Sequence, residues 1–283
     1  MSHVTVLGAG TMGHGIAHAS VMAGYETVMY DVAAAALESG RAAIRSIIRK
    51  GVELGKVTAD EAAAAENRLS TTNDLAGAVS RADFVVEAAP EKIALKLELL
   101  ASVERHAPAG AVVASNTSSL SVTEMGAALS NPSRLAGMHF FNPVHKMKLV
   151  EIVRALESSD ATIRSIEEVA KAMGKETVVV RDSAGFITSR VNAMIGNEAF
   201  FMLQEGVASA RDIDKALKLG LNHPMGPFEL VDLVGLDTRL SVLEFLHKSL
   251  GEKYRPCPLL VQHVKAGRLG KKVGKGVYEY PRP

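Results

Sequence analysis

Residues 3–13 read HVTVLGAGTMG, and this stretch decides the fold of the N-terminal part of the chain. Its first five residues are a short β-type run, which predicts a strand. A glycine-rich turn follows directly, and the small and apolar residues between Ile16 and Ala23 then predict a helix. A strand, a G-x-G-x-x-G turn and a helix in this order predict a unit that binds a dinucleotide.

Each glycine of the turn has its own role in such a unit. Gly8 permits the tight turn, Gly10 lets the backbone approach a pyrophosphate, and Gly13 lets the helix pack closely on the strand. The helix begins at Thr11 and Met12, where free N–H groups and a partial positive charge attract phosphates. We therefore expect these five residues to bind the cofactor.

An acidic residue indicates which dinucleotide is bound. A second expected strand, residues 26–30, ends in Asp31, which lies 23 residues after Gly8. A carboxylate there accepts hydrogen bonds from the adenosine ribose and repels a 2′-phosphate. No Arg or Lys follows before Arg41. The sequence therefore predicts NAD as the cofactor rather than NADP.

The composition excludes several classes of protein. The 283 residues include 32 basic and 31 acidic side chains, a net charge of +1, with 5% aromatics and no Trp. We expect no binding of nucleic acid, which needs a basic surface or stacking aromatics. The single Cys257 excludes an intramolecular disulfide and a Cys-rich metal site, and it favours a cytoplasmic location. No apolar run reaches the roughly 18 residues of a membrane span, and no bound metal is expected.

Strands and helices alternate through the first part of the chain. Further β-type runs lie at 84–87, 111–114, 135–140, 149–153 and 177–180, and helical patterns lie at 91–104 and 161–173. This alternation predicts an α/β, Rossmann-type, doubly wound and mostly parallel sheet. Two further helical stretches, at about 33–50 and about 59–68, predict a helical hairpin inserted into this domain.

The pattern changes at Ser183. Helical periodicity continues at 187–207, 210–219, 227–234 and 236–250, with no convincing strand before 276–278. We expect a Rossmann domain over 1–182, followed by an all-helical C-terminal domain over 183–283.

His139 and Glu151 are the expected catalytic pair. His139 lies on one expected strand and Glu151 lies 12 residues later on the next, so the two side chains can meet. A carboxylate behind an imidazole fixes its tautomer and stabilises the imidazolium. Oxidation of a secondary alcohol needs such a base to take the hydroxyl proton. Asn116 and Ser118, which follow another strand, could hold the substrate oxygen.

Six stretches of the sequence resemble one enzyme family, the L-3-hydroxyacyl-CoA dehydrogenases, and most closely the bacterial 3-hydroxybutyryl-CoA dehydrogenases. The stretches are GAGTMGHGIA (8–17), DFVVEAAPE (83–91), ASNTSSL (114–120), HFFNPVHKMKLVE (139–151), ALKLGLNHPMGPFELVDLVGLD (216–237) and GRLGKKVGKGVYEY (267–280). The resemblance covers nearly the whole chain. It implies NAD-dependent oxidation of (S)-3-hydroxyacyl-CoA, a homodimer formed through the helical domain, and CoA bound along the helical hairpin and the interdomain cleft.

The resemblance also implies roles for single residues. His139 would be the catalytic base, Glu151 its partner, and Ser118 a contact to both the substrate oxygen and the nicotinamide end. The residues implied or expected to contact NAD are Asp31, Glu91, Lys96, Asn116, Ser118 and Asn142.

Two features concern the substrate. The family usually has Asn in a GF[IV]xNR segment, where it contacts the substrate, but here Ser189 replaces it. A serine is shorter but can still hydrogen-bond a carbonyl or a water. Lys50 and Lys56, on the expected hairpin, would either meet CoA phosphates or form a solvated basic face.

Two other functions stay open. Relatives of this fold oxidise other hydroxy acids or sugar acids. A requirement for CoA in the substrate would distinguish the oxidation of 3-hydroxyacyl-CoA from this second function. A third reading, of a different class, is an inactive structural relative that binds NAD. The intact pair of His139 and Glu151 argues against it.

Overall fold

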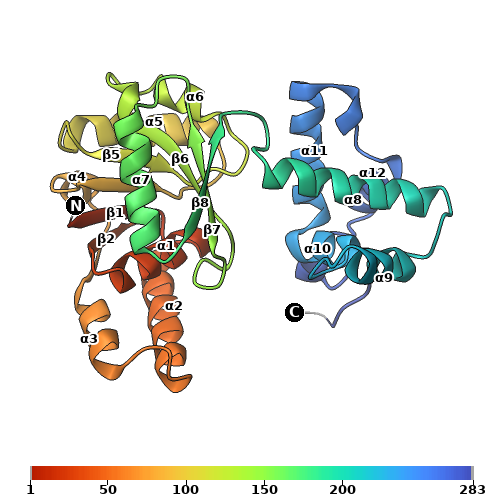
Figure 1. Cartoon of the computed structure of the whole chain (residues 1–283), viewed down its shortest axis with the longest axis horizontal. Coiled ribbons are helices and arrows are strands. Elements are labelled where there is room, and N and C mark those ends of the chain that lie inside the picture. The colour runs from red at the N-terminus through yellow and green to blue at the C-terminus, as the bar shows by residue number, and fades with distance from the viewer. Residues whose placement is uncertain (1, 282–283) are drawn as a thin grey trace. The chain divides into compact units, whose positions relative to one another are not determined.

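The computed structural model of the chain describes residues 2–281. The chain divides after Ser183 into two compact units, one residue beyond the expected boundary. The first unit contains a sheet with helices, and the second contains helices (Figure 1).

The first unit is built on an eight-stranded sheet in the order β3-β2-β1-β4-β5-β6-β7-β8. The strands are β1 (His3–Leu7), β2 (Glu26–Tyr30), β3 (Leu69–Thr72), β4 (Phe84–Glu87), β5 (Val112–Ser115), β6 (Leu135–Phe140), β7 (Leu149–Arg154) and β8 (Glu176–Arg181). All neighbouring strands are parallel except β6 and β7. Every residue of β4 and β5 is buried, as expected for central strands of a parallel sheet. The predicted doubly wound, mostly parallel fold is confirmed.

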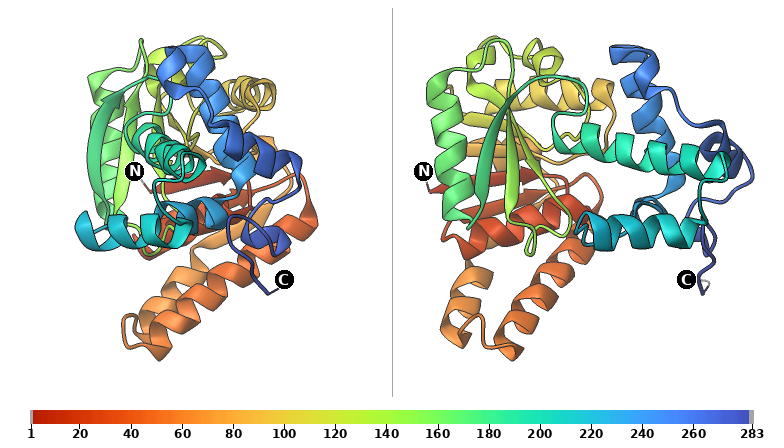
Figure 2. Two further views of the ribbon diagram at one scale, coloured as in Figure 1. Left: turned by 90° about the vertical axis from the view of Figure 1, so that its right-hand side faces the viewer. Right: turned by 45° about the vertical axis from the view of Figure 1, so that its right-hand side comes forward.

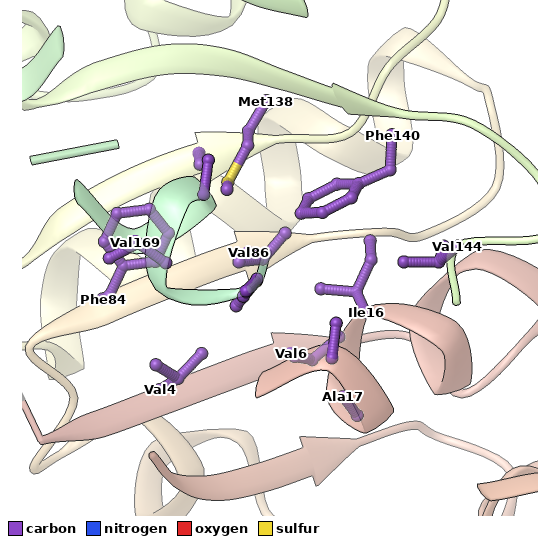
Figure 3. Close-up of a cluster of buried hydrophobic side chains, with 14 of the residues drawn as sticks. Val4, Val6, Ile16, Ala17, Phe84, Val86, Met138, Phe140, Val144 and Val169 are labelled. Carbon is purple, nitrogen blue, oxygen red and sulfur yellow. The ribbon is translucent and has the colours of Figure 1, made fainter. Parts of the chain in front are cut away.

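Helices cover both faces of the sheet (Figure 1). On one face lie α1 (Thr11–Met22) and α7 (Asp160–Ala172), and on the other lie α4 (Leu75–Val79), α5 (Ile93–His106) and α6 (Val122–Gly126). The core on the first face is shown in Figure 3, where Ile16 of α1 and Val169 of α7 converge on Val6, Val86 and Met138 of the strands. All five side chains are at most 1% exposed.

The predicted helical hairpin is present between β2 and β3. It consists of α2 (Ala34–Glu53) and α3 (Ala59–Asn67), which extend away from the sheet side by side (Figures 1 and 2). Thr58 and Glu61 form a capping box that starts α3, because each side chain accepts a backbone N–H of the other residue. The base of α2 is anchored in the core through Leu37, Ile44 and Ile48.

The second unit has its own core of helices. Its elements are α8 (Thr188–Gln204), α9 (Ala210–Gly220), α10 (Pro227–Val234), α11 (Leu236–Leu250) and α12 (Pro258–Lys265), with short 3-10 turns η2 (Glu252–Tyr254) and η3 (Lys271–Val273). Phe200 of α8 and Phe228 of α10 pack edge to face at its centre, with ring centroids 5.1 Å apart. This agrees with the predicted all-helical composition.

Several short elements differ from the sequence-based expectation. The edge strand β3 and the single-turn helix α4 were not predicted, because LSTT and LAGAV are too short for a clear periodicity. The helix α12 was also missed. Around 276–278 the described residues form isolated bridges rather than a strand. The η1 turn (Pro132–Arg134) completes the first unit. No helix within residues 2–281 combines the length and the apolar character needed to cross a bilayer.

Candidate active site

The last residues of four neighbouring strands lie in register along one edge of the sheet, and the fifth strand, β6, continues three residues beyond this row. The residues in this row are Tyr30 of β2, Leu7 of β1, Glu87 of β4, Ser115 of β5 and Gly137 of β6. In open α/β sheets, ligands bind beyond the carboxyl ends of the strands. The loops that leave this row carry most of the expected site residues, so the register of the sheet gathers them at one edge.

The glycine-rich turn between β1 and α1 has the geometry that the sequence predicts. Gly8 has a φ of +108°, and a Cβ there would lie 2.6 Å from the Ala88 carbonyl oxygen. A Cβ on Gly13 would lie 1.9 Å from the Gly8 carbonyl oxygen, so neither position accepts a side chain. Gly10, in contrast, has no atom within 4 Å of its Cβ position and caps α1 without a side-chain partner. Open space therefore lies beside the first turn of α1, where an anion binds well.

Asp31 follows β2 and reaches back to this turn. Its Oδ2 accepts the backbone N–H of Ala9 at 2.9 Å, and its Oδ1 accepts that of Ala33 at 3.0 Å. Each carboxylate oxygen can accept a second hydrogen bond. Asp31 therefore fixes the glycine-rich turn and retains the capacity to bind a ribose hydroxyl.

A buried ion pair lies beneath the ends of β4 and β5. Lys96 of α5 and Glu87 are 1% and 0% exposed, and the Lys96 ammonium donates to both Glu87 oxygens, at 2.7 and 2.9 Å. Glu87 also accepts the Ser115 hydroxyl at 2.5 Å and the backbone N–H of Ala89 at 2.7 Å. The Glu87 carboxylate therefore connects α5, the end of β5 and the loop after β4 by hydrogen bonds.

Glu91 organises the turn that carries Ser118. One of its carboxylate oxygens accepts hydrogen bonds from the Thr117 hydroxyl at 2.6 Å and from the backbone N–H groups of Ser118 and Ser119 at 2.9 and 3.2 Å. The other oxygen lies 3.4 Å from the Lys96 ammonium. Burial alone would raise the pKa of Glu91, but these hydrogen bonds and the charge of Lys96 outweigh it, so the pKa lies below its ordinary value.

These contacts change the view of Lys96. The family resemblance implies that Lys96 contacts the cofactor directly, but its ammonium is occupied by Glu87, Glu91 and the Ala89 carbonyl oxygen. A direct contact with NAD stays a prediction. Glu87 and Ser115 were not predicted as site residues. A glutamate that ends a fully apolar strand is the signal that could have revealed the pair, because a buried carboxylate needs a cation or several donors.

His139 and Glu151 lie directly opposite each other in the antiparallel pair of β6 and β7. His139 Nδ1 lies 2.8 Å from Glu151 Oε2, and the two side chains are 8% and 0% exposed. Because Nδ1 faces a carboxylate, Nδ1 carries the proton of the neutral ring and Nε2 carries the basic lone pair. The Phe141 ring packs against the imidazole with a centroid separation of 4.6 Å. The structure thus brings the expected pair together.

The two expected asparagines differ in surroundings. The Asn116 Oδ1 atom accepts the backbone N–H of Phe140 at 2.9 Å, which joins the loop after β5 to β6 close to His139. Its amide NH₂ group can donate to a ligand. Asn142 is exposed in the loop that follows β6.

The remaining expected residues lie away from this edge or in the other unit. Lys50 lies in the last turn of α2 and Lys56 in the loop before α3, and both are exposed. Ser189 lies in the first turn of α8 and is half-buried.

A histidine cluster was not predicted from the sequence. The rings of His18 on α1 and His145 in the loop between β6 and β7 pack edge to face, with centroids 6.2 Å apart. Burial, followed by the charges of His145, Lys175 and His14, lowers the pKa of His18 to about 4. The Lys175 ammonium also holds the loop by donating to the Met147 carbonyl oxygen at 2.9 Å. The spacing of His14 and His18, one helical turn apart, was the available signal.

Comparison with known proteins identifies the family. The model of the NAD-binding domain of 3-hydroxyacyl-CoA dehydrogenases matches residues 3–183, and the model of the C-terminal domain matches residues 185–280. The chain belongs to the 3-hydroxyacyl-CoA dehydrogenase family. The two matched regions meet at the boundary between the two units.

Similar proteins extend over the full length of the chain. A probable 3-hydroxybutyryl-CoA dehydrogenase of Bacillus subtilis is 46% identical over 99% of this chain and 98% of its own length. The 3-hydroxybutyryl-CoA dehydrogenase of Bradyrhizobium diazoefficiens is 42% identical, over 98% and 94%. The crystal structure of (S)-3-hydroxybutyryl-CoA dehydrogenase PaaH1 from Ralstonia eutropha covers both chains completely, with 41% identity and a TM-score of 0.97.

Family membership confirms the predicted class of enzyme and its cofactor. The chain is an NAD-dependent dehydrogenase of the 3-hydroxyacyl-CoA type. The open turn at Gly10, the uncapped start of α1 and the Asp31 carboxylate fit a dinucleotide.

Proposed function

We propose that the chain converts short-chain (S)-3-hydroxyacyl-CoA, above all 3-hydroxybutyryl-CoA, reversibly into 3-oxoacyl-CoA. His139, paired with Glu151, is the general base in the oxidation and the general acid in the reduction. The observation that carries the proposal is the buried pair itself, whose Nδ1 and Oε2 atoms are 2.8 Å apart. The names of the full-length relatives, which are 3-hydroxybutyryl-CoA dehydrogenases, support the short chain.

In the oxidation, His139 takes the proton of the substrate hydroxyl at Nε2. Glu151 holds the ring in the tautomer that exposes this lone pair and stabilises the imidazolium that forms. Ser118 and Asn116, on the neighbouring loop, hold the substrate oxygen by hydrogen bonds. Bound NAD supplies the acceptor for the hydride that leaves the carbon. In the reverse direction, His139 returns the proton to the carbonyl oxygen.

The glycine-rich turn and Asp31 hold the cofactor. The residues proposed to surround it are Gly8, Gly10, Thr11, Met12, Gly13, Asp31, Glu91, Lys96, Asn116, Ser118 and Asn142. Glu91 supports the nicotinamide end by ordering the Ser118 turn, to which it accepts three hydrogen bonds of 2.6–3.2 Å. Lys96 in turn fixes Glu91 by its charge.

The rest of the proposal concerns substrate and assembly. Ser189 contacts the substrate at the position of the family's usual Asn, and Lys50 with Lys56 meets the phosphates of CoA. The active form is a homodimer built through the C-terminal helical domain, and the enzyme is cytoplasmic. The family resemblance supports the substrate contacts and the homodimer, and the single Cys257 supports the cytoplasmic location.

The experiment is a reductase assay with acetoacetyl-CoA and NADH, followed by the absorbance of NADH. We expect His139→Gln to lower kcat by about 10² to 10⁴, the usual contribution of a general base. His106→Gln is the matched control, since His106 is exposed at the end of α5. A wild-type protein that reduces free acetoacetate equally well would instead act on another hydroxy acid, and one that oxidises no NADH would be a structural relative. If His139→Gln stays within a few-fold of the wild type, the proposed base is wrong.

A further inference from the structure

The turn that carries Ser118 is followed directly by the start of α6. Ser121 is the N-cap of this helix, and its hydroxyl accepts the backbone N–H of Glu124 at 3.1 Å. The same hydroxyl donates to Oδ2 of Asp182 at 2.9 Å, and the backbone N–H of Thr123 donates to that oxygen at 2.8 Å. One carboxylate oxygen of Asp182 therefore holds the chain three residues after Ser118.

Asp182 is itself fixed to the sheet. It directly follows β8, which ends next to α6 (Figure 1), and its backbone N–H donates to the Arg154 carbonyl oxygen at the end of β7 at 2.9 Å. A second contact comes from the same region, because the backbone N–H of Leu156 donates to the Thr123 hydroxyl at 3.1 Å. Since β7 also carries Glu151, the start of α6 is tied to the strands that position the proposed catalytic pair.

Hydrogen bonds connect the start of α6 with the Ser118 turn continuously. The Leu120 N–H donates to the Thr117 hydroxyl at 3.0 Å, and that hydroxyl donates to Glu91 at 2.6 Å. The N–H groups of the two residues after Thr117 donate to the same Glu91 oxygen. Two carboxylates therefore hold the turn, Glu91 from the loop after β4 and Asp182 from the end of β8.

We propose that Asp182 is a positioning residue of the reaction, which sets the place of Ser118 relative to His139 and Glu151. The inference rests on the proposed function, in which the Ser118 hydroxyl holds the substrate oxygen and His139 takes or returns its proton. Both groups must reach the same oxygen atom, so their relative position has to be held to within about 0.5 Å. Glu91 cannot do this alone, because it ties the turn to β4 and α5 and not to the strand of Glu151.

The chemistry of the contact suggests a matched pair of variants. A carboxylate that accepts a hydroxyl and a backbone N–H forms charge-assisted hydrogen bonds, which are stronger than neutral ones. Both donors meet one oxygen of Asp182, so an asparagine can keep both bonds through its Oδ1 atom. A leucine has a similar size and keeps neither. Asp182→Asn and Asp182→Leu therefore separate the loss of the charge from the loss of the connection.

The first measurement needs no catalysis. Deuterium exchange in a peptide that contains residues 117–121 reports whether the N–H groups of the turn stay bonded. We expect Asp182→Leu to speed this exchange by at least about tenfold, and Asp182→Asn by less than about threefold. Ser159→Ala is the matched control, because it removes a similar N-cap from α7 and should leave the exchange of the turn as it is.

The second measurement is a double-mutant cycle. Its readout is the rate of NADH oxidation in a single turnover with acetoacetyl-CoA, which excludes product release. Asp182→Leu should lower this rate by about tenfold to a hundredfold, the effect of misplacing a group near the reacting atoms by about 1 Å. In a Ser118→Ala background the same change should lower the rate by less than about threefold, because the hydroxyl that Asp182 positions is already absent. A merely structural role would make the two losses multiply.

The outcomes separate this inference from the proposed function. Unchanged exchange of the turn in Asp182→Leu, or losses that multiply in the cycle, overturns the inference even if acetoacetyl-CoA is reduced. If Asp182→Leu does not fold, Ser121→Ala replaces it, because it removes one of the two bonds to Asp182 and should show both effects at a smaller size; neither effect in that variant overturns the inference as well. If the wild type reduces no acetoacetyl-CoA while the exchange depends on Asp182, the proposed function fails and the anchoring of the turn by Asp182 stands.

Discussion

Lys96→Met tests the buried ion pair at the edge of the sheet. The variant removes the cation but leaves the Glu87 carboxylate, which is 0% exposed. Removing one partner of a buried ion pair costs about 3–5 kcal/mol, since the remaining charge is uncompensated. Glu87 keeps two donors, the Ser115 hydroxyl and the Ala89 N–H, so we expect the lower end of this range, about 3 kcal/mol.

The assay is urea-induced unfolding, followed by circular dichroism. The double variant Glu87→Gln plus Lys96→Met removes both charges, so it should recover most of the loss. Lys92→Met, which changes an exposed lysine at the start of α5, should shift the free energy of unfolding by less than about 0.5 kcal/mol. A loss of less than about 1 kcal/mol in Lys96→Met, or a double variant no more stable than the single one, would refute the reasoning. KM for NAD should also rise in Lys96→Met, because Glu91 loses the cation 3.4 Å from it.

Three further predictions concern the two ends of the reaction site and the histidine cluster. Glu151→Gln keeps the shape but removes the charge that stabilises the imidazolium of His139, so kcat for oxidation should fall while the Kd of NADH, measured by its own fluorescence, stays the same. Asp31 should give a preference for NAD over NADP of at least about tenfold in kcat/KM, and Asp31→Asn should reduce this preference; equal efficiency of the wild type with both would contradict the role of Asp31. His18 has a folded-state pKa of about 4, below the ordinary 6.5, so the unfolded chain binds its proton more readily. Stability should therefore fall as the pH drops from about 6.5 towards 4, and His18→Gln should weaken this dependence in urea denaturation; an unchanged dependence would count against it.

The sequence alone was sufficient to predict the central strands of the sheet and the contact between His139 and Glu151. The strand β4 is an apolar run that ends in Glu87, and β6 is apolar apart from His139. Such short runs have few alternatives to a buried strand. Once β6 and β7 are placed as consecutive strands, a separation of 12 residues allows a hairpin-like return, and the structure pairs the two residues in register. Short elements such as β3 gave no such signal, because four residues contain barely two periods of alternation.

The hydrogen-bond and ion-pair partners of the site residues were harder to predict than the site residues themselves. Glu91 and Lys96 were identified by resemblance to a family, but their hydrogen bonds depend on how α5 returns beneath the ends of β4 and β5. That return is set by tertiary packing, since Leu100 and Val103 of α5 are fully buried. A sequence pattern can indicate that a glutamate at a strand end needs a cation, but not which lysine supplies it.

The two buried cations Lys96 and Arg239 have different surroundings, which lead to different expectations for the stability of their variants. At Lys96, two glutamates and a carbonyl oxygen satisfy the ammonium, and one of these glutamates, Glu91, orders the Ser118 turn. At Arg239, the described chain supplies one amide oxygen and no charge. Because an unpaired buried charge is costly, Arg239→Met should leave the free energy of unfolding unchanged or raise it, in contrast to Lys96→Met. Helical periodicity alone would place residue 239 in the core, where an aliphatic side chain costs less than an arginine with a single hydrogen bond.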